Sequence, residues 1–218
     1  MPRPEPAVSS AEPPRACPLC PRLVAYRQVN REAHPDWWNG PAPSFGDPTA
    51  RLAVVGLAPG RMGANRTGRP FTGDFAGVLL FETLIKQGFA QGSYEARPDD
   101  GLKLVDCLIT NAVRCAPPGN KPETSEENTC RPFLTARLDQ LPNLKVIVTL
   151  GDVSRRNVLK ALGLKASAGV GGHGSEFQAG PYRVINSYHC SRLNTNTGRL
   201  TPQMFEDIFI RARELLTD

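Results

Sequence analysis

Short apolar runs alternate with amphipathic stretches from residue 52 to the end of the chain. The apolar runs are rich in valine, leucine and isoleucine, which is typical of buried parallel strands, and lie at 52–57, 102–110 and 146–150, with weaker runs at 176–179 and 183–187. Apolar residues at helical spacing lie between or after these runs, at 78–88, 124–141, 152–162 and 202–215. Strands that alternate with helices predict a three-layer α/β/α sandwich with a central, mainly parallel sheet of four strands.

Local capping signals set the expected helix starts. Pro21 suits the first position of a short helix over 21–28. Thr124 and Glu127 have the spacing of a capping box, which predicts that a helix begins there. Thr201 is the expected cap of the last helix, because Pro202 follows it at the first helical position.

The first 16 residues differ in composition from the rest of the chain. They are rich in proline and contain almost nothing to bury, so we expect a disordered tail over 1–16. Residues 17–218 are then expected to form a single domain, since no internal repeat or second composition shift interrupts them.

Composition excludes some broad classes of protein. Of the 218 residues, 40% are hydrophobic and 22% are charged, as in globular proteins rather than disordered ones. No apolar run approaches the roughly 20 residues of a membrane span, and residues 1–16 contain no apolar stretch of a secretory signal. We therefore expect a cytoplasmic protein. The net charge of +5 is compatible with a nucleic-acid partner but does not require one.

Three of the predicted strands are followed by unusual polar segments. They read GLAPGRMGANRTGRPFTGD over 56–74, ITNAVRC over 109–115 and NSYHCSRLN over 186–194. Ligands of open parallel sheets bind at the carboxyl ends of the strands. If one sheet holds all three strands, their polar residues meet in a single cleft.

The long glycine-rich segment after the first strand also suggests a phosphate-binding loop. It matches neither the P-loop pattern nor a compact G-x-G-x-x-G, which makes a nucleotide-binding fold the weaker interpretation. Taken singly, Asp74 suits a helix cap, Asn111 a turn and His189 a packed loop. Their joint position at strand ends favours a functional role.

The segments GLAPGRMGANRTGRPFTGD, ITNAVRC and HCSRLNTNTGRLT closely resemble motifs of the type 5 uracil-DNA glycosylases, the UDGb family. The resemblance extends from Cys17 to the C-terminal helix. The related type 4 enzymes usually carry a glutamate in the first motif, where this chain has Leu57 and Ala58, which indicates the type 5 branch. The chain has Met62 where the family often has histidine, and Cys190 at a position that varies among relatives.

This resemblance implies a uracil-DNA glycosylase-like fold and a monofunctional DNA glycosylase. Such an enzyme hydrolyses the N-glycosidic bond of uracil, hypoxanthine or xanthine in double-stranded DNA during base excision repair. It is expected to act as a monomer in the cytoplasm, on the nucleoid when bound to DNA. No lysine in the matched motifs can form a Schiff base, so we expect no lyase step.

The reaction assigns a role to each matched residue. Cleavage leaves positive charge on the sugar, which the Asp74 carboxylate would stabilise while orienting water, and negative charge on the base, to which His189 would donate. Asn111 complements the imide edge of uracil, and Phe71 matches the family's stacking position for the everted base. Small residues of the first motif are expected to close the pocket: Gly56, Ala58, Pro59 and Gly60.

The segment after His189 is expected to meet the DNA. Arg192 or Leu193 would fill the gap that the extruded base leaves, as apolar wedges do in other DNA-binding proteins. The expected phosphate contacts are Arg66, Arg69, Ser191, Asn194 and Arg199.

Four of the six cysteines, Cys17, Cys20, Cys115 and Cys130, match the family's ligands to a [4Fe–4S] cluster. Four thiolates alone are also compatible with tetrahedral zinc, which the resemblance makes the less favoured interpretation. The cluster would have a structural role, because glycosidic hydrolysis needs no electrons. Cys107 lies in a strand-like run and is expected to be buried rather than a ligand.

Two other functions fit the same residues. The chain can be a lesion-binding protein that lacks turnover, or that crosslinks to the abasic sugar through His189. It can also be a redox or zinc-ribbon protein in which the cysteines are the working part. Incubation with DNA containing a deaminated base separates these possibilities.

Overall fold

The computed structural model describes residues 10–217. The expected tail over 1–16 is therefore only partly covered, since residues 1–9 lie outside the described residues. For residues 10–16 the expectation of disorder is wrong. Ala11 is buried, and Glu12 forms ion pairs with Arg114 at 3.1 Å and with Arg137 at 2.6 Å. Hydrogen bonds and charge, rather than apolar burial alone, hold this proline-rich segment against the fold.

A six-stranded sheet forms the centre of the molecule, in the order β1-β5-β2-β6-β8-β7. Its four central strands are parallel, as predicted: β5 (Cys107–Asn111), β2 (Leu52–Gly56), β6 (Val146–Leu150) and β8 (Tyr182–Ser187). Two further strands pair antiparallel at the edges, β1 (Phe45–Gly46) and β7 (Glu176–Ala179). Of these two edge strands, the sequence predicts only β7, from the weak run over 176–179.

The predicted strand over 102–110 is divided in two. Its first part is β4 (Lys103–Leu104), which pairs with β3 (Ala90–Gln91) in a separate two-stranded sheet. Its second part is β5, in the central sheet. Asp106 separates them with a φ of 52°, a left-handed conformation that a strand cannot accommodate, and its carboxylate binds Arg51.

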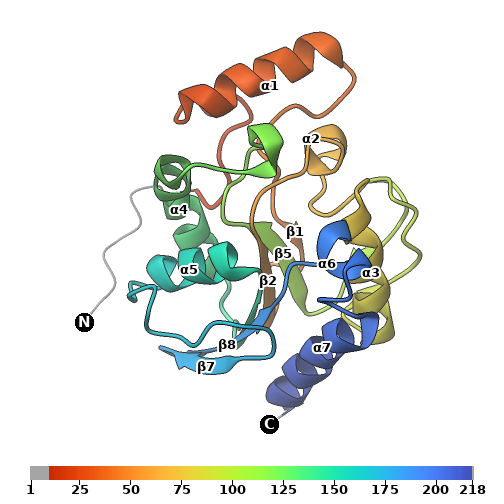
Figure 1. Ribbon diagram of the computed structural model, residues 1–218, viewed down its shortest axis with the longest axis vertical. Helices are drawn as coiled ribbons and strands as arrows, with labels where there is room; N and C mark the ends of the chain where they lie inside the picture. The colour runs from red at the N-terminus through yellow and green to blue at the C-terminus, as the bar shows by residue number, and fades with distance from the viewer. Residues whose placement is uncertain (1–9, 218) are drawn as a thin grey trace.

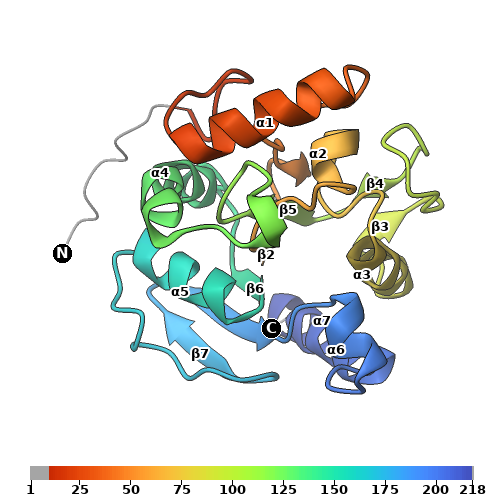
Figure 2. The same ribbon diagram turned by 45° about the horizontal axis from the view of Figure 1, so that its top comes forward.

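Helices cover both faces of the sheet, which makes the predicted three layers (Figure 1). α3 (Phe75–Lys86) and α7 (Pro202–Thr217) pack on one face, and α4 (Thr124–Asp139) and α5 (Asp152–Ala161) on the other. α1 (Pro21–Ala33) lies across one end of the molecule, near α2 (Ala64–Thr67) and α4 (Figure 2). The short α6 (Arg192–Asn196) lies near the start of α3. Among residues 10–217 no helix has the length and apolar character needed to cross a bilayer.

Two helices differ from the sequence prediction, α1 at its end and α4 at its start. α1 continues to Ala33, five residues beyond the expected end. The capping box of α4 is formed by Glu123 and Glu126, one residue before the predicted pair, and the side chain of Glu126 accepts from the backbone N–H of Glu123 at 2.8 Å. Glu126 also binds Arg22 of α1 at 2.7 Å, so a tertiary ion pair contributes to fixing the start of the helix.

Candidate functional site

A cleft of about 440 Å³ lies at the carboxyl ends of β2, β5 and β8 and at the start of α3. The structure brings four of the predicted site side chains into this one cleft: Phe71, Asp74, Asn111 and His189. Ala58, Pro59 and Gly60 line it as well, while Gly56 lies directly behind Phe71 and Asn111. The cleft is therefore assembled from segments that are more than 100 residues apart in the sequence.

The two carboxylate oxygens of Asp74 face different parts of the site. It is the N-cap of α3, where its Oδ1 accepts a hydrogen bond from the backbone N–H of Gly77 at 3.3 Å. Its Oδ2 faces the loop after β2, where a Cβ on Gly60 would lie 3.0 Å away and one on Gly63 would overlap it. Burial raises the pKa of this carboxyl group, although the N–H groups of Gly77 and Ala76 act in the opposite direction.

Phe71 presents its ring to the cleft from a strained turn. Its φ of 54° lies in the left-handed region that non-glycine residues rarely adopt. The ring is buried, and its centroid lies 6.2 Å from that of His189, with 30° between the planes. A Cβ at Gly56 would lie 2.7 Å from Phe71 Cζ and would overlap Asn111 Oδ1, so glycine is needed behind both side chains.

Asn111 ends β5, paired in register with Gly56 of β2. Only 2% of the residue is exposed, and its Oδ1 has no hydrogen-bond partner in the described part of the chain. An unsatisfied buried oxygen costs on the order of 1–3 kcal/mol. Because Asn111 also lines the cleft, its unsatisfied oxygen indicates a site that is completed by a donor on a ligand.

His189 follows β8 and lies recessed in the cleft. Burial lowers the pKa of its imidazole, which keeps the ring neutral at pH 7. Its backbone carbonyl accepts a hydrogen bond from Asn194 Nδ2 at 2.8 Å, and Ser191 Oγ caps α6 by accepting from the N–H of Asn194 at 3.4 Å. The predicted phosphate contacts Ser191 and Asn194 thus also fix the loop that carries His189.

The other predicted DNA contacts differ in their exposure and in what they bind. Leu193 is 72% exposed, and Arg192 lines the cleft with its guanidinium 5.2 Å from the Phe75 ring. Arg199 is exposed and lies over the Tyr188 ring. Arg66 is half-buried and donates to the backbone carbonyls of Met62 and Gly73, so it braces the loop before Asp74.

For Arg69 the predicted phosphate contact is wrong. Its guanidinium is buried and forms a bidentate ion pair with Asp100, with N–O distances of 2.7 and 2.6 Å. Arg69 Nε donates to Thr72 Oγ1 at 2.7 Å. These bonds leave the side chain no access to DNA. Its partner comes from a loop 31 residues away, which no local sequence pattern reveals.

Several lining residues were not assigned a role from the sequence, among them Arg61, Phe75 and Asn120. Arg61 is held by α1, since its Nε donates to Asn30 Oδ1 at 2.7 Å and its guanidinium lies 5.2 Å from the Trp37 ring. Arg61 lies within the first motif and Phe75 directly follows it, so their positions in the sequence could have indicated a place in the site. Asn120 reaches the cleft from a separate turn after β5, for which the sequence offered no such signal.

The four candidate ligand cysteines line a second, apolar cavity of about 20 Å³. It is enclosed by α1, α4 and the segment after β5, with Leu23, Val113 and Phe133 among its walls. Arg27 Nη1 lies 3.6 Å from Cys115 Sγ, and the N–H of Arg114 donates to Cys130 Sγ at 3.3 Å. Cys107, the first residue of β5, and Cys190 are buried elsewhere, in the core between the sheet and the helices α3 and α7.

The protonation and the grouping of these thiols bear on metal binding. Burial is the main reason why the pKa of Cys115 is raised to about 12 and that of Cys130 to about 11, so the cavity without a cation favours thiols over thiolates. Within residues 10–217 no three His, Cys, Asp or Glu side chains are grouped closely enough to hold a single metal ion.

Comparison with known proteins gives a consistent family. Residues 43–213 match the family model of the Uracil DNA glycosylase superfamily. A type-5 uracil-DNA glycosylase of Thermus thermophilus is 44% identical over 206 residues, which is 92% of this chain and 94% of that protein. One of Pyrobaculum aerophilum is 42% identical over 90% of this chain and 87% of its own. A type-4 uracil-DNA glycosylase of Thermotoga maritima is 34% identical over 75% of this chain and 77% of its own.

Proposed function

This chain belongs to the type-5 uracil-DNA glycosylases of the Uracil DNA glycosylase superfamily, and we propose that its cleft excises uracil, hypoxanthine and xanthine from double-stranded DNA. The enzyme is a DNA glycosylase that acts on uracil-containing DNA in repair. The proposal extends this activity to the deaminated purines and to double-stranded DNA. It also describes the enzyme as a monomer of the cytoplasm that is on the nucleoid when bound to DNA.

The observation that carries the proposal is the buried, unpaired Oδ1 of Asn111, a residue that lines the same cleft as the Phe71 ring. Uracil has an N3–H donor between two carbonyl oxygens, which complements an amide that offers both an acceptor and a donor. The Phe71 ring supplies a face on which an everted base can stack. Recognition of uracil thus satisfies an oxygen that is unpaired in the free protein.

Bond cleavage needs opposite charges stabilised at opposite ends of the substrate. The Asp74 carboxylate, at the start of α3, suits the developing sugar cation and an attacking water. His189 lies across the cleft and, as a neutral imidazole, can donate a hydrogen bond to the departing base. No lysine is present among the described residues that line the cleft, which supports hydrolysis without a lyase step.

The surface around the cleft supports action on a duplex. Leu193 projects from α6 with 72% of its surface exposed, as expected of a wedge that replaces an everted base in the stack. Arg192 and Arg61 at the cleft wall provide positive charge for the flanking phosphates. The cleft wall at 58–60 consists of the small residues Ala58, Pro59 and Gly60, which supports the acceptance of purines as well as uracil.

Incubation with three duplexes tests the proposed function. Each duplex carries one uracil, hypoxanthine or xanthine, and product is detected as alkali-labile strand cleavage. We expect all three duplexes to give abasic product with an intact backbone before alkali. A heat-stable complex would indicate instead a lesion-binding protein that crosslinks through His189, and release of uracil alone would restrict the substrate range.

The four cysteines of the second cavity suit a [4Fe–4S] cluster as the resident cofactor, which is also what the family resemblance implies. Cys17, Cys20, Cys115 and Cys130 all line the cavity, and four thiolates are the ligand set of such a cluster. A cluster bound there would tie α1 and α4 to the segment that follows Asn111, and would supply structural stability and no step of the hydrolysis.

Purification without oxygen tests this assignment. The protein is expected to show a broad visible absorption band and to contain iron and acid-labile sulfide in equal amounts. Cys115→Ala should abolish the band and lower the thermal midpoint, because one ligand and the cluster's cross-link are lost. Cys107→Ala, a substitution at a buried cysteine outside the cavity, should keep the band. A colourless protein with bound zinc would contradict the assignment.

A further inference from the structure

The turn that carries Phe71 needs support from outside itself. A φ of 54° is a strained conformation for a non-glycine residue, and such conformations persist only when the surroundings impose them. Gly73, two residues later, also has a positive φ of 91°. The direction of the Phe71 ring therefore depends on what binds the backbone of residues 71–73.

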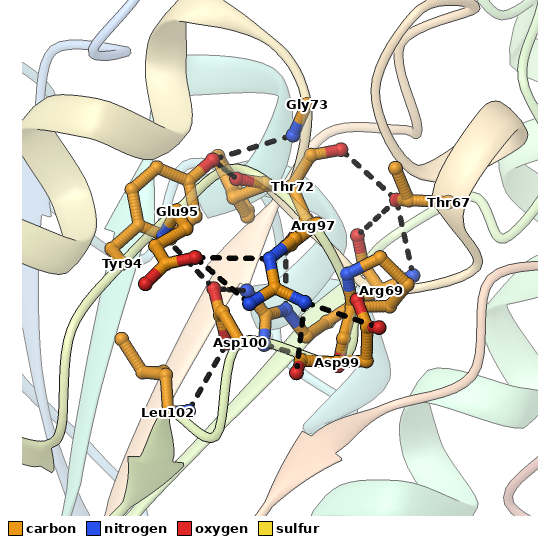
Figure 3. A network of polar contacts seen from close by, with 12 residues as sticks. Thr67, Arg69, Thr72, Gly73, Tyr94, Glu95, Arg97, Asp99, Asp100 and Leu102 are labelled. Atoms are coloured by element: carbon orange, nitrogen blue, oxygen red, sulfur yellow. Dashed lines mark hydrogen bonds and ion pairs between the residues drawn. The ribbon is translucent and has the colours of Figure 1, made fainter.

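The hydroxyl of Tyr94 binds both ends of this turn. Tyr94 Oη donates to the backbone carbonyl of Phe71 at 3.1 Å and accepts from the N–H of Gly73 at 3.3 Å. Figure 3 shows the Tyr94 side chain reaching toward Gly73 from the neighbouring loop. One hydroxyl thus links the carbonyl and the amide on either side of Thr72.

The first turn of α3 fits closely against the same bridge. A Cβ on Gly77 would overlap the Phe71 carbonyl oxygen and the Tyr94 hydroxyl. Only glycine at 77 lets the helix backbone approach this closely. Because Gly77 also donates to Asp74 Oδ1, the bridge lies directly beside the N-cap that places the carboxylate.

Tyr94 is itself held firmly. Its ring stacks on Phe81 of α3, with centroids 4.6 Å apart. The loop that follows it closes around the buried carboxylate of Asp100, which accepts from the N–H groups of Glu95 at 3.1 Å and Leu102 at 3.0 Å. Hydrogen bonds and the adjacent Arg69 guanidinium hold the pKa of Asp100 well below its usual range, so this carboxylate stays charged.

Arg69 connects this loop to the turn from the other side. It pairs with Asp100 and donates to Thr72 Oγ1, while Thr67 Oγ1 donates to the Thr72 carbonyl at 3.0 Å (Figure 3). The side chains of Arg69 and Asp100 are 6% and 0% exposed, so the anchor is shielded from solvent. The polar network therefore fixes Tyr94 and the turn relative to each other.

We propose that Tyr94 is a positioning residue for base recognition, whose hydroxyl holds the Phe71 ring where an everted base stacks. This inference rests on the proposed function, because it gives the ring a base to contact. Tyr94 does not touch the cleft and acts only through the turn. Loss of its hydroxyl frees the strained backbone of Phe71 to relax and turns the ring away from the base.

Tyr94→Phe is the direct test, since it keeps the ring that stacks on Phe81 and removes only the bridge. Single-turnover release of uracil is expected to fall about 10- to 100-fold, the size of effect that a small misplacement of a substrate contact produces. Affinity for duplex with a tetrahydrofuran abasic analogue, which has no base to stack, should stay unchanged. Tyr26→Phe, on α1, is the matched control and should release uracil at the wild-type rate.

A double-mutant cycle separates positioning from general damage. Phe71→Ala alone should slow uracil release strongly, and Tyr94→Phe added to it should change the rate by less than about twofold, because its effect passes through the ring. Additive losses would overturn the inference, as would a wild-type rate in Tyr94→Phe.

Amide hydrogen exchange decides the inference separately from activity. Protection of the Gly73 N–H should fall in Tyr94→Phe and remain in Tyr26→Phe, because this amide donates to Tyr94 Oη. Unchanged protection overturns the inference even if the enzyme is active. A wild-type protein that released no uracil would refute the proposed function, while the exchange result would still decide whether Tyr94 holds the turn.

Discussion

Asp74→Asn is expected to slow single-turnover uracil release by about 10²–10⁴-fold, the range for loss of a charge or proton acceptor that acts in the transition state. The substitution removes the negative charge that would face the sugar cation. It keeps a side-chain oxygen to accept from the Gly77 N–H, and asparagine caps helices as well as aspartate does. The loss is therefore chemical rather than a consequence of unfolding α3.

The charge of Asp74 should also determine how the rate of uracil release depends on pH. Burial raises the pKa of Asp74, so the carboxylate becomes protonated at a higher pH than an exposed aspartate. Since the ionised form is the active one, the wild-type rate should fall on the acid side as pH drops through this raised pKa. Asp74→Asn should show a low rate without this acid limb.

Thermal unfolding and binding complete the test of Asp74. A raised pKa means that the fold disfavours the charged form, so Asp74→Asn should have an unchanged or higher thermal midpoint at pH 7. Affinity for uracil-containing duplex should persist. A variant that releases uracil at the wild-type rate would remove Asp74 from the mechanism.

Asn111→Leu is expected to reduce uracil release by about 10²–10³-fold while leaving the protein at least as stable as the wild type. Leucine has a similar size but offers neither the acceptor nor the donor that the imide edge requires, so a buried uracil would lose its partners. In the free protein the same change removes a buried oxygen that has no hydrogen bond in the described residues. Activity and stability should thus move in different directions.

Asn186→Leu is the matched control for this prediction. Asn186 is also a buried asparagine at the end of a central strand, but its Oδ1 accepts from Thr149 Oγ1 at 2.7 Å and its Nδ2 donates to the Val170 carbonyl at 2.8 Å. Leucine there breaks satisfied bonds and should lower the thermal midpoint. If Asn111→Leu destabilised the protein to the same extent, Asn111 would be a structural residue rather than a base contact.

The central sheet and its helices could be predicted because their signals are local. A buried strand such as 146–150 reads as a continuous apolar run, and α7 shows its apolar face at helical spacing after Pro202. The site followed from the topology: polar residues after parallel strands meet at one edge of the sheet, and Asp74, Asn111 and His189 do so.

Predictions that depended on distant partners failed. Arg69 looked like a phosphate contact because an arginine in a glycine-rich loop is usually solvated, but Asp100 neutralises it in the interior. Residues 10–16 looked disordered because they contain little to bury, yet Glu12 pairs with Arg114 and Arg137, more than 100 residues later in the chain. The capping box of α4 lies one position earlier in the chain than predicted, and its Glu126 also binds the distant Arg22.

By itself the sequence determined the order of strands and helices, the family motifs and the side chains that meet at the carboxyl ends of the strands, since hydrophobic periodicity and chain connectivity are local properties. Only the tertiary structure decided which charges are available to DNA, how Tyr94 holds the strained Phe71 turn and that Asn111 Oδ1 is left unpaired. Those features depend on distances of a few ångströms between residues far apart in the chain. Burial matters there because a buried polar group that lacks a hydrogen bond costs more free energy than an exposed one.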